Sequence, residues 1–306
     1  GFSADSQENL YAGTEAGNSS DADTCFNVAI GYSAGYSNAS GDGNVFVGKC
    51  AGYCYNDTGL IAIGDLAGAS QRSGNYNIYF GKCVASTVAC NNTSGFNFGA
   101  GFGVLRGVTT GSCNVAIGYE ALSGAVTGGS NVAFGRNAGG SSMTGSDNTA
   151  IGRCSMNGTV TGANNIAMGC KAAINLSSGA DNIALGQLAM GSGTVTGDFN
   201  IALGMNAGKS ITSAAYNILI GKCAGCTLQT GTNNTYIGLQ AGGLTNATYG
   251  NTAVGRRAHC AHTTGNYNSM FGAGAGRNHT SGAYNVAIGN NVYLPKAIGN
   301  SQLAIG

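Results

Sequence analysis

A five-residue phrase returns along the whole of this 306-residue chain. Each copy has an Asn-rich first position, then an apolar, a small and an apolar residue, and then Gly, as in Asn27-Val28-Ala29-Ile30-Gly31. The closing glycines lie 16 to 19 residues apart, at positions 13, 31, 48, 64, 81, 99, 118, 135, 152, 169, 186, 204, 221, 238, 255, 272, 289 and 306. A short fixed period over a whole chain is typical of a solenoid, in which each coil buries its apolar face against its neighbours.

The period predicts an all-β fold, a parallel β-solenoid (β-roll or β-helix) of about 18 coils forming one continuous repeat region over residues 1–306. At ~4.8 Å per stacked strand, we expect a rod of roughly 85 Å. The composition agrees with this, because 55 Gly, one Pro and 8% charged residues are unusual for a globular enzyme, whereas 43% hydrophobic residues are too many for a disordered tract. Both ends of the chain fall inside the repeat, so we expect a segment of a longer fibre.

Charge and hydropathy argue against two classes of partner. The 13 basic and 12 acidic residues nearly cancel and are scattered, so the sequence lacks the basic surface that nucleic acid or an anionic membrane attracts. No apolar run approaches the roughly 20 residues that span a bilayer. We expect no contact with nucleic acid, and no membrane contact within this segment.

Side chains alternate along a strand, so the second and fourth positions of the phrase share one face. Both are apolar almost throughout, and we expect this face, including Ile220 and Ile288, to fill the coil interior. The third position lies on the opposite face and is usually Ala, but large residues replace it at Tyr79, Leu219, Tyr236 and Met270. Strands that are apolar on both faces are usually buried on both, which favours a homotrimeric fibre of parallel chains covering that second face.

The Asn that opens the phrase is a candidate structural ladder. Its side chain can stack on the next one along the solenoid, or it can simply tolerate a left-handed backbone at the strand entrance, and the sequence leaves both interpretations open. The candidate ladder residues are Asn27, Asn44, Asn77, Asn114, Asn131, Asn148, Asn165, Asn182, Asn200, Asn217, Asn234, Asn251, Asn268 and Asn285.

Eleven cysteines are many for a reducing cytosol, and their spacing does not form a zinc motif. Disulfides are the favoured interpretation, with an odd thiol left over. Three pairs are close enough in sequence to join one coil, namely Cys50 with Cys54, Cys83 with Cys90, and Cys223 with Cys226.

Ten Asn-x-Ser/Thr sequons also suit an exported protein, although a chain rich in Asn, Ser and Thr produces some by chance. They begin at Asn18, Asn38, Asn56, Asn91, Asn92, Asn157, Asn175, Asn233, Asn246 and Asn278. All lie in the variable segments between phrases or beside them. We expect glycosylation and recognition to concentrate in those segments, because there the sequence varies without breaking the strand ladder.

Catalytic and metal-binding patterns are weak. His259-Cys260-Ala261-His262 is the one cluster that suits a metal, but it follows a bend, so a solvent-facing loop is the favoured interpretation; His279 lies in a sequon. Acidic residues such as Asp147 and Asp181 occupy turn positions where Asp bonds local backbone. We therefore predict no catalytic residue, no metal and no cofactor, and class the protein as a non-enzyme.

The phrase Asn-Val-Ala-Ile-Gly followed by Ala three residues later, as at Asn27 to Ala34, resembles the head repeats of trimeric autotransporter adhesins. Its 17-residue form with Thr-Gly before the Asn, as at Thr161 to Gly169, is similar to repeats of phage tail-fibre and related surface-fibre proteins. The resemblance covers essentially the whole chain and implies a trimeric left-handed parallel β-roll or β-helix with a role in surface attachment. The period and the cysteine content depart from the adhesin pattern.

Three function classes follow. The first is a structural component of an extracellular, cell-surface or virion-surface fibre that mediates attachment, with itself as partner and a host glycan or protein as receptor. The second is a purely structural extracellular filament. The third, an ice- or crystal-binding solenoid, is disfavoured because Thr-Val-Thr occurs only at residues 159–161 and 194–196 instead of in every coil.

Overall fold

The computed structural model describes residues 5–86 and 90–306. In that part of the chain every regular element is a short β-strand. The contacts divide the chain into two compact units, Gly1–Ala150 and Ile151–Gly306, and each is described by itself. β12 (Thr149–Ile151) includes residues of both units.

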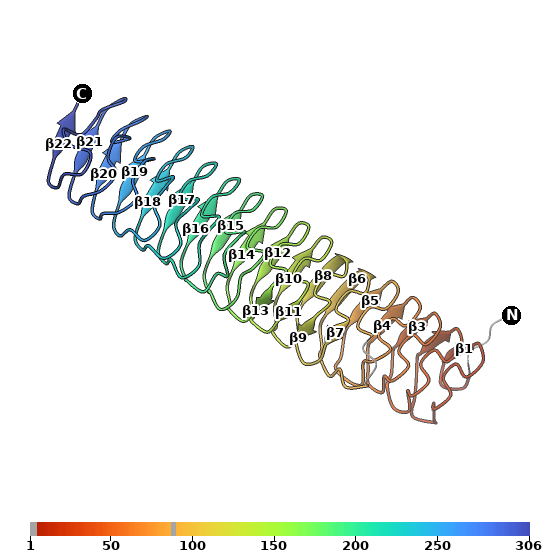
Figure 1. The fold of residues 1–306 in the computed structure, drawn as a ribbon. Coiled ribbons are helices and arrows are strands. Elements are labelled where there is room, and N and C mark those ends of the chain that lie inside the picture. The colour runs from red at the N-terminus through yellow and green to blue at the C-terminus, as the bar shows by residue number, and fades with distance from the viewer. Residues whose placement is uncertain (1–4, 87–89) are drawn as a thin grey trace. The chain divides into compact units, whose positions relative to one another are not determined.

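The first unit is built on one parallel sheet in which each strand pairs with the next strand of the same sheet (Figure 1). Its strands are β1 (Leu10–Ala12), β2 (Val28–Ile30), β3 (Val45–Val47), β4 (Ile61–Ile63), β5 (Ile78–Phe80), β6 (Phe98–Phe102), β8 (Val115–Tyr119) and β10 (Val132–Phe134). A second parallel sheet joins β7 (Gly107–Val108), β9 (Ala125–Val126) and β11 (Ser142–Met143).

The second unit repeats this arrangement, again with consecutive strands paired in parallel (Figure 1). Its strands are β14 (Ile166–Met168), β15 (Ile183–Leu185), β16 (Ile201–Leu203), β17 (Ile218–Ile220), β18 (Thr235–Ile237), β19 (Thr252–Val254), β20 (Ser269–Phe271), β21 (Val286–Ile288) and β22 (Leu303–Ile305), with the short β13 (Thr159–Val160) before them. Equivalent positions of successive phrases are in register, as Ile201 is with Ile218. The predicted parallel β-solenoid is confirmed.

The closing glycine of the phrase is required by the distance between coils. Gly221 has a φ of +126°, and a Cβ on it would lie 2.6 Å from the carbonyl oxygen of Gly238 in the next coil. Any residue larger than Gly would therefore clash with the backbone of the next coil, which cannot move without breaking the hydrogen bonds between the strands. This contact recurs from coil to coil and explains why the phrase always ends in Gly.

One phrase lies two residues later than the sequence predicts. We expected it to end at Gly99, but β6 pairs Ala100 with Ile117 and Gly101 with Gly118, so the phrase is Asn97 to Gly101. The Gly-rich run 99–103 offers several positions for the closing Gly, and only the strand pairing distinguishes them. Asn97 is therefore a ladder residue that the sequence reading missed.

The prediction of which strand face lies inside was wrong. The third position is buried, including Leu219 and Tyr236, which are fully inaccessible to solvent, whereas Ile220 is only half-buried and Ile288 is 41% exposed. Tyr79 and Met270, expected to face neighbouring chains, are buried inside the single chain as well. The interior between stacked turns is narrow, and it takes up the Asn, the small residue and the Gly, while the bulkier second and fourth positions point outward.

Large interior residues are matched by small ones a few positions later. Tyr236 at the third position is followed by Gly242, four residues after the closing Gly, and a Cβ on Gly242 would lie 2.5 Å from the Tyr236 ring. Ala184 leaves room in its own coil, and there the equivalent residue is the buried Met190. The two positions thus share one interior volume, as close packing requires.

Candidate functional site

The Asn residues form hydrogen-bonded rows inside each unit. In the second unit the Oδ1 of Asn217 accepts the backbone N–H of Asn234 at 3.0 Å, and the Nδ2 of Asn217 donates to the carbonyl of Gly231 at 2.9 Å. The left-handed residue at each strand entrance is the one before the Asn, such as Tyr216 with a φ of 57°. These buried amides find several partners each, which satisfies polar groups that water cannot reach.

The row in the first unit has one interruption. Asn27 accepts the N–H of Asn44 at 2.9 Å, and Asn44 accepts the N–H of Leu60 at 2.7 Å. Leu60 has no side-chain acceptor to continue the row, which resumes where Asn77 accepts the N–H of Asn97 at 2.9 Å. The row tolerates an apolar residue because the backbone ladder continues past it, with Ile61 donating to the carbonyl of Asn77.

The outer face of the main strands, defined here by the second and fourth phrase positions, is an apolar surface that recurs from coil to coil. Among the described strands none of these positions is buried, and Ile218 is 37% and Phe271 42% exposed. None of them carries a charged residue; Thr and Ser are the only polar replacements. Contiguous exposed apolar area of this kind marks interaction surfaces in soluble proteins.

Aromatic pairs, two of them stacked and one tilted, border the outer face. They stand directly before the Asn of consecutive phrases, with ring centroids 5.1 to 5.6 Å apart. The pairs are Tyr76 with Phe96, Phe199 with Tyr216, and Tyr267 with Tyr284. All six side chains are largely exposed, up to 63% at Tyr284, so they extend the apolar surface of the outer face.

The cysteines pair differently from the sequence prediction. Cys54 is bonded to Cys90, with Cα atoms 5.7 Å apart, and this connects residues 36 positions apart in the sequence. The predicted pairs Cys50 with Cys54 and Cys83 with Cys90 are therefore wrong, and Cys50 and Cys83 are free. Closeness in sequence does not set the direction of a side chain in a tight turn, whereas stacking of turns brings distant cysteines together.

Cys223 and Cys226 are also free, so the third predicted pair is not formed. Burial, and next the neighbouring Cys223 thiol, raises the pKa of Cys226. Cys226 also donates to the carbonyl of Gly243 at 3.6 Å. The two thiols are neighbours in one turn, but they are held as separate thiols.

The sequons divide by exposure. Most begin at accessible residues, among them Asn56 and Asn246. Asn38 does not, because it is 1% exposed and its Nδ2 donates to the carbonyl of Gly41 while its Oδ1 accepts the Gly41 N–H. Asn92 is buried as well. Asn38 is therefore removed from the candidate glycosylation sites, since a glycan there requires the turn to unfold.

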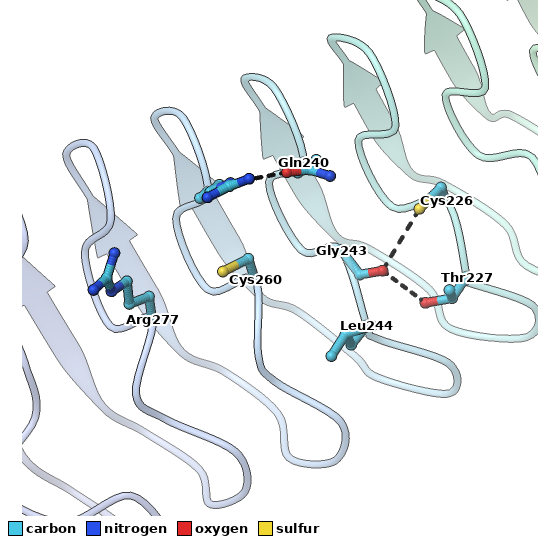
Figure 2. Close-up of a pocket in the computed structure, with 8 residues that line it drawn as sticks. Cys226, Thr227, Gln240, Gly243, Leu244, Cys260 and Arg277 are labelled. Atoms are coloured by element: carbon cyan, nitrogen blue, oxygen red, sulfur yellow. Dashed lines mark hydrogen bonds between the residues drawn. The ribbon is translucent and has the colours of Figure 1, made fainter.

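A surface groove lies over the turns of the second unit (Figure 2). Arg257 donates to the Oε1 of Gln240 at 2.9 Å on one wall, and Thr227 donates to the carbonyl of Gly243 at 3.0 Å on the other. Leu244 and Arg277 also line it. Among the described residues lining it, the titratable groups are guanidiniums and thiols, so the groove offers positive charge but no carboxylate pair for acid–base chemistry.

The three histidines lie in the interior, not in solvent-facing loops as predicted. His259, His262 and His279 are fully inaccessible to solvent and stack on one another. Burial lowers the pKa of all three, that of His262 to about 4, with the nearby His279 as the second cause there. The sequence reading missed this because it did not count the residues from the closing Gly: His262 and His279 both stand seven residues after it.

Comparison with known proteins finds no protein-family model that matches this chain and no curated protein sequence that is similar to it. Residues 5–86 and 90–306 contain no helix of the length and hydropathy needed to cross a bilayer.

Proposed function

We propose that this chain is the repeat region of an extracellular fibre, on a cell or virion surface, in which three parallel chains associate through their outer faces and present the segments between coils for attachment. The observation that carries the proposal is the outer face, which is uncharged and apolar in coil after coil and remains half-exposed in the single chain. The phrase resemblance to adhesin heads and tail fibres supports the same role.

The outer face suits a symmetric partner. Strand pairing in register places equivalent phrase positions of successive coils in line, so a rotation axis parallel to the stack brings equivalent positions of each chain together. Burial of apolar surface contributes roughly 25 cal/mol per Å², and this gain repeats with every coil. In a trimer, the three outer faces pack against one another around the axis, and the turns of each chain face the solvent.

The segments between coils supply the recognition surface in this proposal. They hold most of the exposed sequons, and in the second unit they form the groove with Arg257 and Arg277. Loops on a rigid scaffold commonly carry binding residues, because their sequence varies without cost to the scaffold. A host glycan or a surface protein is the receptor class that we propose.

Immunogold electron microscopy of the source cells or virions, with antibody against the purified chain, tests the role. We expect labels on thin surface projections, and we expect the purified chain to bind host cells saturably. Labelling confined to the cell interior contradicts the fibre. Surface labelling without saturable host binding favours the purely structural filament.

A further inference from the structure

We infer that His259, His262 and His279 form a binding site for one divalent transition-metal ion, best suited to Zn²⁺, in the interior of the second unit. His259 and His262 follow β19, and His279 follows β20. They are the only histidines of the chain, and the fold brings all three together. The inference is independent of the proposed fibre role.

The spacing of the nitrogen atoms is close to what an ion needs. One nitrogen from each ring lies within 4.8 Å of the other two, and the Nε2 of His259 is 3.0 Å from the Nδ1 of His279. With Zn–N bonds of about 2.0–2.1 Å, ligands of a tetrahedral ion lie roughly 3.4 Å apart. The rings are now nearly parallel, with interplanar angles of 11° to 23°, so binding requires them to turn until their lone pairs converge.

The cluster contains buried nitrogens without hydrogen-bond partners. These are the Nδ1 of His259 and both ring nitrogens of His262. A buried polar group without a partner costs about 1–3 kcal/mol, so such groups are rare in stable interiors. An ion bound through the Nε2 of His259, the Nδ1 of His279 and one nitrogen of His262 gives one of the unpartnered nitrogens a partner, and it replaces the hydrogen bond between His259 and His279 with two metal bonds.

The surrounding coils show that an apolar interior is available at these positions. Seven residues after the closing Gly, the coils before the cluster carry Ile211 and Leu228, both buried, and Thr245. The change to His262 and His279 in the same column replaces aliphatic and hydroxyl side chains with imidazoles, and both ring nitrogens of His262 lack hydrogen-bond partners. The packing of a coil does not require histidines in this column, whereas a metal site does.

His259 completes the set at a position where neighbouring coils have Gly. Gly242 and Gly276 stand there, because a Cβ would strike Tyr236 in one coil and Met270 in the other. In the His259 coil the third phrase position is Ala253 instead. The small residue leaves the space that the imidazole fills, which places the third nitrogen beside the other two.

Burial keeps the imidazoles neutral, which is the form that binds metal. The amide nitrogen of Asn285 lies 3.1 Å from the Nε2 of His279, but it also donates to Asn268 at 2.9 Å and Gly299 at 2.8 Å. Its two hydrogens are therefore satisfied by oxygens. The ring of His279 lies against this amide, and its Nδ1 is 3.0 Å from the Nε2 of His259.

The test is Zn²⁺ binding by the full chain, stripped with chelator and measured by calorimetry at pH 7, and by metal analysis after refolding in Zn²⁺ because the site is enclosed. We expect one ion per chain and a rise in Tm with Zn²⁺. His262→Leu, which copies Leu228, should lower the affinity at least tenfold and abolish the Tm rise. His279→Leu should do the same, while both variants remain folded without metal.

The free cysteines are the necessary control, because thiolates also bind zinc. A Cys223→Ser, Cys226→Ser, Cys260→Ser variant should keep the ion. X-ray absorption should show nitrogen at about 2.0–2.1 Å and no sulfur at about 2.3 Å. Sulfur ligation, equal binding by His262→Leu, or no ion after refolding in Zn²⁺ overturns the inference.

Discussion

The Oδ1 of Asn217 accepts two hydrogen bonds from Asn234, one from its backbone N–H and one from its side-chain amide, each at 3.0 Å. One buried side chain therefore connects two coils, and the second amide hydrogen of Asn234 is donated to the carbonyl of Thr248 at 2.7 Å. The same relationship links Asn251 to Asn268. The row of Asn residues acts as an internal connection between successive turns of the backbone.

Asn217→Ala should destabilise the fold by about 1–3 kcal/mol, because the donors of Asn234 lose their acceptor in a site without water. Urea unfolding followed by circular dichroism measures the change. The matched control is Asn246→Ala, which replaces an exposed Asn and should stay within about 0.5 kcal/mol of the parent. Equal effects of the two substitutions contradict a structural role for the row.

Tyr236 and Gly242 share one interior volume, so their substitutions should not be additive. Gly242→Met alone should be strongly destabilising, since its side chain meets the Tyr236 ring and φ is +58°. Tyr236→Ala alone should cost about 3–5 kcal/mol through the cavity it leaves. The double variant copies the Ala184 and Met190 pair and should recover part of the loss. Strict additivity of the two unfolding free energies contradicts a shared volume.

The strand phrase and its period were sufficient to predict the parallel solenoid, because few other folds are compatible with a Gly that recurs at a nearly constant spacing along the whole chain. They were not sufficient to predict which face of each strand is buried. Leu219 and Ile220 are adjacent apolar residues in one strand. Leu219 is buried and Ile220 is half-exposed, and hydropathy does not distinguish them. Size and hydrogen bonding do, since the Asn and the small third position lie on the same face and need a narrow, dry interior.

The histidine cluster could be found only by counting from the closing Gly. His262 and His279 are 17 residues apart and thus occupy equivalent positions in successive coils, whereas His279 in isolation reads as part of a sequon. The contribution of His259 depends on the small Ala253, a packing relationship that the linear sequence does not display. The Cys54 to Cys90 bond is hidden for a similar reason, because it depends on how the turns stack.

Peptide mapping without reduction should recover a Cys54–Cys90 crosslink as the main disulfide, because stacking of the turns places their Cα atoms 5.7 Å apart. Cys54→Ser should remove this crosslink and leave Cys90 open to alkylation. The control is Cys113→Ser, which replaces an exposed free thiol and should leave the map unchanged. A main crosslink between Cys50 and Cys54, or between Cys83 and Cys90, contradicts the observed pairing.

The metal-free protein should lose stability as the pH falls from about 6.5 to about 4. Burial lowers the pKa of His262 from 6.5 to about 4 in the folded chain, so the unfolded chain binds more protons in this window. The stabilising contribution is therefore complete above about pH 6.5 and is lost on acidification. Each unit of pKa difference corresponds to about 1.4 kcal/mol.

Urea unfolding at several pH values, in chelator, measures this dependence. The difference between the parent and His262→Leu isolates the histidine from the carboxylates, which titrate in both proteins. We expect the variant to have the shallower slope between pH 6.5 and 4. Parallel curves for the two proteins show that His262 does not titrate with unfolding.

Association through the outer face should fail when that face is charged. Replacing Ile201 and Ile218 together with Asp places carboxylates on the half-exposed second positions of β16 and β17, and should release single chains that keep their β-sheet circular dichroism. The matched control is Leu244→Asp, because Leu244 is 54% exposed but lies on a turn. It should leave the assembly intact.

Sedimentation equilibrium of the unmodified chain in dilute solution tests the central claim most directly. The chain has a mass of 30.2 kDa, so a trimer has about 91 kDa. We expect the trimer mass at micromolar concentration, unchanged on further dilution and reduced to that of one chain by the paired Ile201 and Ile218 substitutions. A parent chain that sediments at 30.2 kDa under these conditions contradicts assembly through the outer face.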